Sequence, residues 1–288
     1  MQSFKNSVAV RQARESETAA YRALSLAHEL TDRFQEALSL RSLAFTLGTR
    51  GVTVESETAI LRSERISQAT SDKQATGNEE AYRVQLALWS QNPGAARSLA
   101  NNAWHLAHVL NYERDFIQAA RLQGEVALGL NDFVSADERL LHALTRARKV
   151  NFVEEELLAL VALADLRRRQ RDVKAARELL DDAWELAERG PYPLFHSDAF
   201  NVLAQIERDR GNTEAAIEAA TKAYRLAWCN GPPFAYHWGL EKAKQHLKEL
   251  GAPVPEMPPF DESKFEPMPE VEIDPDDEFH VGNSSEEG

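Results

Sequence analysis

A pattern of small residues recurs along this chain at a fixed interval of forty residues. Between Arg171 and Ala187, small side chains at Ala176 and Ala183 have the spacing of one helical face. The same phase returns in six copies without slippage, which predicts an array of similar stacked units. The equivalent positions in the other copies are Ser16, Ala20, Ala23, Ala27; Ser56, Ile60, Ser63, Ser67; Asn92, Ala96, Ala100, Ala103, Ala107; Asp132, Ala136, Leu140, Ala143, Ala147; and Asn212, Ala216, Ala220, Ala223, Ala227.

Each unit is predicted to be a pair of helices. Asn92, Asp132, Asp172 and Asn212 stand just before a small-residue helix, where a side-chain oxygen accepts a hydrogen bond from a free backbone N–H. Pro93 follows its cap at the first helical position, which proline favours. A second helical segment lies upstream of each cap. The clearest of these first helices are Phe34–Leu47, Glu79–Ser90, Asp115–Leu130, Glu154–Gln170 and Ser197–Arg210.

The sequence therefore predicts an all-α fold, a right-handed α-solenoid of stacked helical hairpins. Residues 1–233 form six units of forty residues, of which the first is incomplete. Residues 234–250 form one more helix, with Leu240, Ala243 and Leu247 on one face, which we interpret as a C-terminal cap. Residues 251–288 contain seven of the twelve prolines and are predicted to be largely extended or disordered.

The beginning of the chain leaves two interpretations open. Only residues 1–12 precede the second helix of the first unit, and they do not form the polar cap that usually ends a solenoid. One interpretation is that the chain is a fragment whose missing part covers the first unit. The other is that Met1 is the true start and that the first helix frays.

The net charge of −13 is distributed unevenly. Residues 251–288 hold twelve acids and one base, whereas the other 250 residues hold 34 acids and 32 bases. A nearly neutral body argues against nucleic acid as a partner. No apolar run is long enough to span a membrane, and no signal-peptide core is present. The single cysteine, Cys229, fits a reducing compartment, so we expect the cytoplasm.

Motifs for catalysis, metals and cofactors are absent from the sequence. His105 and His108 lie three residues apart on one predicted helix, but no cysteine or acid cluster joins them at ligand spacing, so we interpret them as surface histidines. Cys229 has no histidine placed by the sequence to activate it. The chain contains no P-loop and no nucleophile elbow. We therefore expect a protein that is not an enzyme and that has no cofactor or metal.

Paired helices with small residues at repeat positions 8, 20 and 27 resemble the tetratricopeptide repeat family. Ala164, Ala176 and Ala183 match these positions in the fifth unit. The forty-residue period, rather than thirty-four, and the absence of the family's final proline are departures. Units of this length resemble those of kinesin light chains and of the sensor arms of bacterial signal-transducing NTPases of the MalT and NACHT type. The segment from Trp228 to Lys244 resembles the C-terminus of such NTPases.

The resemblance implies that the first helices line a concave groove whose repeat positions 2, 5, 9, 12 and 13 meet ligands. At position 12, Arg168, Arg208 and Lys248 form a cationic row, which we interpret either as an anion-binding surface or as solvated helix ends. Carried over to this chain, the groove is predicted to use Arg41, Tyr82, Gln85, Arg121, Glu125, Asp165, Arg168, Arg169, Asn201, Gln205, Arg208 and Lys248.

The expected function is binding of a protein or peptide, with an acidic partner as one option, by a sensor arm whose NTPase domain lies in a missing part of the same protein. The alternative is an assembly scaffold that stacks on another chain through its N-terminal unit. A further hypothesis concerns the acidic stretch from Asp274 to Glu278, which either folds back onto the cationic row or stays solvated.

Overall fold

The computed structural model describes residues 13–188, 190 and 193–273 of the chain, and over these residues it contains twelve α-helices. The arrangement is an all-α solenoid of consecutive helical hairpins, which confirms the predicted fold class. The helices are α2 (Ala13–Glu29), α3 (Arg33–Thr49), α4 (Thr53–Ala69), α5 (Lys73–Trp89), α6 (Pro93–Leu110), α7 (Glu113–Gly129), α8 (Phe133–Val150), α9 (Val153–Arg169), α10 (Val173–Ala187), α11 (Pro193–Asp209), α12 (Thr213–Ala227) and α13 (His237–Glu249).

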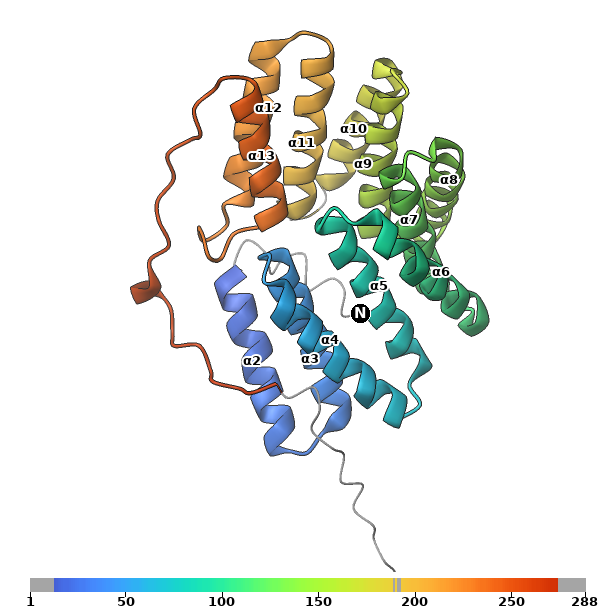
Figure 1. The fold of residues 1–288 in the computed structure, drawn as a ribbon, viewed down its shortest axis with the longest axis vertical. Helices are drawn as coiled ribbons and strands as arrows, with labels where there is room; N and C mark the ends of the chain where they lie inside the picture. Colours follow the sequence, from blue (N-terminus) through green and yellow to red (C-terminus); the bar gives the residue numbers. More distant parts are fainter. Residues whose placement is uncertain (1–12, 189, 191–192, 274–288) are drawn as a thin grey trace, which may run out of the picture.

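The helices form two layers that curve round into a ring (Figure 1). Helices α3, α5, α7, α9, α11 and α13 contact one another in that order and form the inner layer. The outer layer consists of α4, α6, α8, α10 and α12. Each of these helices packs on the inner helix before it and on the inner helix after it in the chain. The inner helices correspond to the first helices predicted from the sequence.

The joints between helices repeat every twenty residues, which is half of the sequence period. Most of these joints hold a residue with positive φ at the same phase, the left-handed conformation that commonly ends a helix. The joint between α12 and α13 is longer and holds two such residues, Cys229 and Gly231. Where the joint is repeated, successive helices turn through a similar geometry and the array curves regularly. The residues of this phase with positive φ are Thr31, Gly51, Ser71, Gln91, Asn111, Asn131, Asn151, Arg171, Gly211, Gly231 and Gly251.

The small residues of the repeat are buried where helices approach closely. Ala176, Ala183 and Ala187 are at most 1% exposed and belong to one apolar cluster that runs from α7 to α11. In α4 the equivalent residues are serines, and they also make polar contacts. Ser67 donates a 2.8 Å hydrogen bond to the buried Glu79 carboxylate, and Ser63 donates another to the same oxygen. The serines therefore supply hydrogen bonds to one oxygen of a buried acid on α5, whose other oxygen, Oε2, has no hydrogen-bond partner among the described residues.

The predicted caps are confirmed at three of the four helices. Asn92, Asp132 and Asp172 each accept a hydrogen bond from a backbone N–H three residues later, at 3.0–3.2 Å. Asn212 stands at the cap of α12 but makes no such bond. Its side-chain amide instead donates a 2.7 Å hydrogen bond to Glu207 on α11, because this buried carboxylate lies beside the joint.

The last inner helix lies against the first, so the solenoid is closed rather than open. The Trp238 indole on α13 donates a hydrogen bond to the carbonyl oxygen of Gly48 at the end of α3, at 2.7 Å. Arg50 donates a hydrogen bond to the carbonyl oxygen of Pro233 at 2.9 Å, and its guanidinium lies 4.2 Å from the centre of the Phe234 ring. The predicted C-terminal cap thus packs on α11 and α12 and also closes the ring.

Gly51 is required at this junction for two reasons. Its φ of +79° is a conformation that residues with a side chain rarely adopt. A Cβ atom added at this position would lie 2.7 Å from ring atoms of His237 at the start of α13. The junction therefore has no room for a side chain at position 51 as long as residue 237 carries its imidazole ring.

Residues 253–273, which we name the strap, run from the end of α13 down to α2 as extended chain interrupted by the short 3-10 helix η2 (Glu262–Lys264) (Figure 1). The Trp228 indole donates a 2.9 Å hydrogen bond to the carbonyl oxygen of Pro258, near the beginning of the strap. Phe260 then packs between Phe234, with ring centres 4.7 Å apart, and Phe265, at 5.2 Å. These contacts hold the first half of the strap against the closed junction.

The second half of the strap covers one face of α2. The Arg14 guanidinium donates a 2.9 Å hydrogen bond to the carbonyl oxygen of Glu266, whose carboxylate pairs with Arg22. Val271 and Ile273 pack against the apolar cluster of the first helices. The strap is extended, as the prolines predict, but these apolar side chains give it a fixed place that its average composition does not indicate. The acids from Asp274 to Glu278 lie outside the described residues.

Candidate ligand-binding cavity

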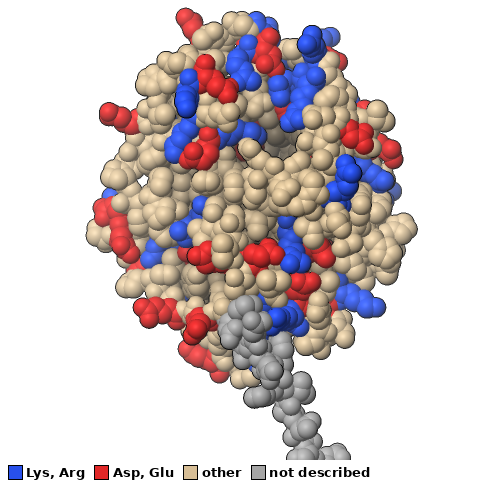
Figure 2. All heavy atoms as spheres, viewed as in Figure 1, with Lys and Arg blue, Asp and Glu red and all other residues tan. Residues whose placement is uncertain are grey.

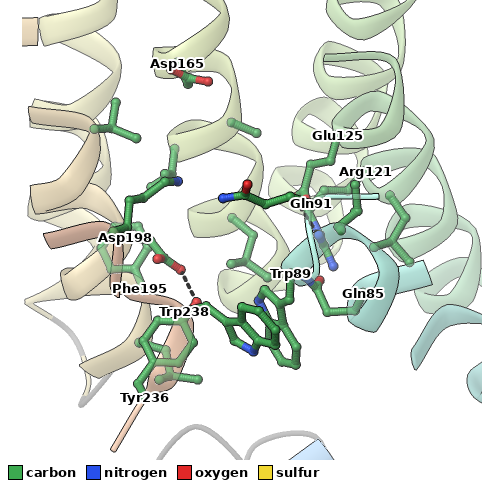
Figure 3. Close-up of a pocket in the computed structure, with 18 of the residues that line it drawn as sticks. Gln85, Trp89, Gln91, Arg121, Glu125, Asp165, Phe195, Asp198, Tyr236 and Trp238 are labelled. Atoms are coloured by element: carbon green, nitrogen blue, oxygen red, sulfur yellow. Dashed lines mark hydrogen bonds and ion pairs between the residues drawn. The ribbon is translucent and has the colours of Figure 1, made fainter. Parts of the chain in front are cut away.

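The inner layer encloses a cavity of about 880 Å³ at the centre of the ring. Every inner helix contributes side chains to its wall, because the same repeat positions point inward in each unit. Aromatic and aliphatic side chains line it together with polar and charged ones (Figure 3). The side chains used in the argument below are Phe45, Tyr82, Gln85, Trp89, Gln91, Gln118, Arg121, Glu125, Glu154, Glu155, Asp165, Phe195, Asp198, Tyr236, Trp238, Glu241, Lys242, Lys244 and Lys248.

Aromatic side chains from three parts of the chain form one side of the cavity, next to the ring junction. Trp89 of α5 and Trp238 of α13 are stacked, with ring centres 6.4 Å apart and planes at 14°. Phe45 lies 5.8 Å from Trp89, and Tyr236 meets the other side of the same indole at 6.4 Å. The side chains that close the ring thus also form the apolar surface of the cavity (Figure 3).

Asp198 on α11 lines the cavity, and its carboxylate has one hydrogen-bond partner among the described residues. The Tyr236 hydroxyl donates a hydrogen bond to its carboxylate at 3.0 Å (Figure 3). Burial raises the pKa of Asp198 to about 6, although Lys242 and the Tyr236 hydroxyl act in the opposite direction. Asp198 is therefore a carboxylate that is poorly solvated and only partly compensated.

Glu154, at the start of α9, is the second such group. Burial, together with the neighbouring Glu155 carboxylate, raises the pKa of Glu154 to about 7, and the cations Arg121 and Arg114 only partly oppose this. Among the described residues it makes no hydrogen bond or ion pair. With a pKa of about 7, Glu154 is present in both its charged and its protonated form at neutral pH.

Arg121, which the sequence predicts as a ligand contact, is held by acids of its own chain. Its guanidinium is 3% exposed and pairs with Glu125 at 2.6 Å and with Glu155 at 2.6 Å. These two carboxylates raise the pKa of Arg121 further above its already high value. Arg121 therefore bridges α7 and α9, and its charge is already compensated before any ligand arrives.

The predicted cationic row is compensated in the same way. Arg168 pairs with Asp165 and with Asp209, each at 2.8 Å, and Arg208 pairs with Glu249. Basic and acidic side chains are interspersed over the face shown in Figure 2 and do not form one basic patch. Lys248 is the member of the row that lines the cavity without an ion pair to a described residue.

The structure brings half of the predicted groove residues to the cavity, namely Tyr82, Gln85, Arg121, Glu125, Asp165 and Lys248. The other predicted residues are used between helices. Arg41 is buried and pairs with Glu79 at 3.3 Å. Asn201 is fully buried and donates a 3.1 Å hydrogen bond to the carbonyl oxygen of Gly239. Gln205 contacts His246, Arg169 pairs with Asp165, and Arg168 and Arg208 make the ion pairs given above.

Asp198 and Trp238 are absent from the predicted groove, although a signal for them exists in the sequence. Both stand at repeat position 2 of their units, one of the positions at which the tetratricopeptide family meets ligands. Carrying that position over would also have selected Gln118, which lines the cavity as well. Glu154 lies outside these positions, so only the three-dimensional structure reveals it.

Among the described residues, no group of three or more histidine, cysteine, aspartate and glutamate side chains is arranged to hold a metal ion. His108 of the His105 and His108 pair instead lies beside the Phe116 ring, with ring centres 6.0 Å apart. Trp104, Trp184 and Tyr224, which share one repeat position, pack on the apolar clusters. Within the described part of the chain, no helix is both long and apolar enough to cross a membrane.

Comparisons with known proteins identify the fold and nothing finer. No family model matches the chain, and no curated protein matches its sequence. Among solved structures it is similar to the crystal structure of BtubC (BKLC) from P. vanneervenii, with a TM-score of 0.55 and 15% identity. The match covers 74% of this chain and 90% of the other. The chain has a helical-repeat fold. At this level of identity the likeness extends to the fold alone.

Proposed function

We propose that this chain is a non-catalytic helical-repeat module of the tetratricopeptide type that binds a protein or peptide in its central cavity. The observation that carries the proposal is that the repeat positions which meet ligands in that family supply Gln85, Arg121, Glu125 and Asp165 to the cavity wall. A concave site that combines aromatic walls with convergent polar groups is the usual form of a binding pocket. The cavity volume of about 880 Å³ suits a short segment of a partner rather than a folded domain.

The closed ring supports a sensing role. From the resemblance of the sequence we further propose that the chain belongs to a larger signalling protein in the cytoplasm, with an NTPase of the MalT or NACHT type in the same protein. A ligand in the cavity would contact inner helices from both ends of the array, including α5 and α13. Binding would therefore stabilise the closed arrangement relative to an open one, as any ligand stabilises the state that it prefers. A change of this kind can be transmitted to an attached domain.

The alternative, an assembly scaffold, receives less support from the geometry. Stacking on another chain would use the N-terminal helix α2, but the strap covers one face of this helix. Arg14 and Arg22 of α2 are engaged by Glu266, and Val271 packs on the cluster that contains Leu24. A constant mass in sedimentation over a wide concentration range would agree with the binding module, whereas concentration-dependent growth would favour the scaffold.

Photo-crosslinking tests the proposal directly. A benzophenone amino acid replaces Gln85 in the cavity or, as a control, Glu178 on the outer helix α10, whose side chain is 65% exposed. After irradiation of cells that produce the protein, we expect a crosslinked partner or peptide at Gln85 and none at Glu178. Crosslinks at Glu178 without any at Gln85 would contradict binding in the cavity.

A further inference from the structure

We propose that the ligand of the central cavity is a basic peptide segment, in which a lysine or arginine stands next to an aromatic or aliphatic residue. The inference rests on the proposed function and adds the chemistry of the ligand to it. It replaces the expectation of an acidic partner, whose basis was the cationic row at Arg168, Arg208 and Lys248.

The first step is an inventory of the charges that line the cavity. Of the ten charged side chains there, six are paired within the chain: Arg121 with Glu125 and Glu155, Asp165 with Arg168 and Arg169, and Glu241 with Lys244. The remaining four make no ion pair to a described residue. They are Glu154, Asp198, Lys242 and Lys248.

The second step separates these four groups by their exposure to solvent. Lys242 and Lys248 are exposed on α13, so water satisfies their charge. Glu154 and Asp198 are only partly exposed and have no cation of the described chain in an ion pair, and burial raises the pKa of both. A carboxylate removed from water either keeps a proton or acquires a cation. The charge that the cavity lacks is therefore positive.

The third step concerns the surface next to Asp198. The Tyr236 hydroxyl that bonds Asp198 belongs to the aromatic group of Trp89 and Trp238. A guanidinium or ammonium group at Asp198 would thus lie beside aromatic faces, which attract cations. The same faces accommodate an apolar side chain. A basic residue adjacent to an apolar one matches both parts of this surface.

The fourth step identifies the ligand as a peptide. The side-chain amides of Gln85, Gln91 and Gln118 line the cavity, and none of them makes a hydrogen bond to a described residue. A carboxamide offers both a donor and an acceptor, which is the complement of a peptide unit. Three such groups in one cavity provide partners for a main chain, in addition to the charged and aromatic contacts for its side chains.

The experiment begins with an unbiased selection. The purified full chain is used to select hexapeptides from a random library displayed on phage. We expect the recovered sequences to combine lysine or arginine with a neighbouring aromatic or aliphatic residue. The affinity of one recovered peptide is then measured by calorimetry for the wild-type protein and for Glu154→Gln and Asp198→Asn. The control is Glu185→Gln, which removes a charge from the exposed surface of α10.

Each cavity variant is expected to weaken binding at least ten-fold, and the control to leave it unchanged. Citrulline in place of the peptide's arginine should weaken binding to the wild-type protein by a similar factor, with little further loss on Asp198→Asn. Acidic or neutral peptides that quench the fluorescence of Trp89 and Trp238 would overturn the basic-ligand inference and leave cavity binding standing. Recovery of no peptide, together with no crosslink at Gln85, would overturn both.

Discussion

The indole Nε1 of Trp238 lies 2.7 Å from the carbonyl oxygen of Gly48, a residue 190 positions earlier in the chain. This hydrogen bond joins the last inner helix to the first. It places the aromatic surface of Trp238 and Trp89 at the junction and, at the same time, on the wall of the cavity. Closure of the ring and formation of the binding surface are therefore one structural event.

The strap is expected to stabilise α2 through its apolar side chains. Replacing both Val271 and Ile273 with serine removes their contacts with the first apolar cluster. We expect the free energy of unfolding to fall by about 1–3 kcal/mol and amide exchange in α2 to become faster. Hydrogen-exchange mass spectrometry measures the second effect. The control is Val254→Ser, at a strap position that is 45% exposed. Unchanged exchange in α2 would show that the strap does not dock there.

The small-residue stripe is expected to reject larger side chains. Ala216 on α12 is fully buried, so Ala216→Leu overpacks a close helix contact and should cost about 1–3 kcal/mol in urea unfolding. Its neighbour Ala215 is exposed, and Ala215→Leu should change stability by less than about 0.5 kcal/mol. Equal effects of the two substitutions would contradict the assigned phase of the repeat.

Arg121 is expected to act in folding before it acts in binding. Arg121→Met leaves the carboxylates of Glu125 and Glu155 without their buried cation, which should cost about 3–5 kcal/mol. Adding Glu155→Met should recover part of this loss, because it removes one of the uncompensated charges. Chemical denaturation of the three proteins measures both values. A loss below about 1 kcal/mol for the single variant would mean that Arg121 is free in solution.

Glu154 is expected to make stability depend on pH. Its folded pKa of about 7 lies above the ordinary value of 4.5, so the folded state binds the proton more tightly than the unfolded state does. The free energy of unfolding therefore decreases as pH rises from about 4.5 to about 7. Glu155 raises this pKa, and Arg121 and Arg114 lower it.

The glutamine in Glu154→Gln does not titrate, so this variant does not share the loss of stability. Its free energy of unfolding minus that of the wild type should rise by on the order of 2–3 kcal/mol between pH 4.5 and pH 8. Urea unfolding at several pH values measures the difference, and Glu185→Gln on the exposed face of α10 serves as the matched control. A difference that does not vary with pH would show that Glu154 is fully hydrated in the folded protein.

The sequence was sufficient to predict the repeat and its helices because a fixed spacing carries that information locally. The small residues and the caps mark where helices begin and which face is buried, and α3, at Arg33–Thr49, extends the predicted segment by only one residue at its start and two at its end. Asn212 illustrates the limit. Its residue type predicts a cap, but the neighbouring Glu207 carboxylate competes successfully for its side chain.

Closure of the ring was not predictable from spacing. It depends on the sum of small rotations over all inner helices and on contacts such as that of Arg50 with the Phe234 ring, between residues distant in sequence. The strap was missed for a related reason. Its prolines and acids dominate the average composition, whereas its position is determined by a few apolar side chains, including Phe260 and Val271.

The groove was predicted in part. Repeat positions transferred from the family identified Gln85 and Glu125, because the inner helices keep the same face toward the cavity. The sequence shows which residues are cationic, but it does not show which of them already form ion pairs with acids of the same chain. Arg168 appeared available in the sequence, yet Asp165 and Asp209 lie within 2.8 Å of it.

A disulfide bond across the junction provides the most direct test of the closed ring. Gly51→Cys and His237→Cys are introduced together, with Cys229→Ser to remove the native thiol. A Cβ atom at position 51 would lie 3.2 Å from that of residue 237, so a shift of a few tenths of an ångström brings the pair to the spacing of about 3.5–4.5 Å that disulfide-bonded cysteines have. The control pairs His237→Cys with Gly211→Cys, which has the same φ of +79° and no atom within 4 Å of its added Cβ.

The closed ring predicts an intramolecular disulfide in the first protein on mild oxidation at low concentration, and none in the control. Mass spectrometry of the non-reduced digest identifies the linked peptides. Free thiols in the first protein, or disulfides that form only between molecules, would contradict the closed ring and the central cavity that depends on it.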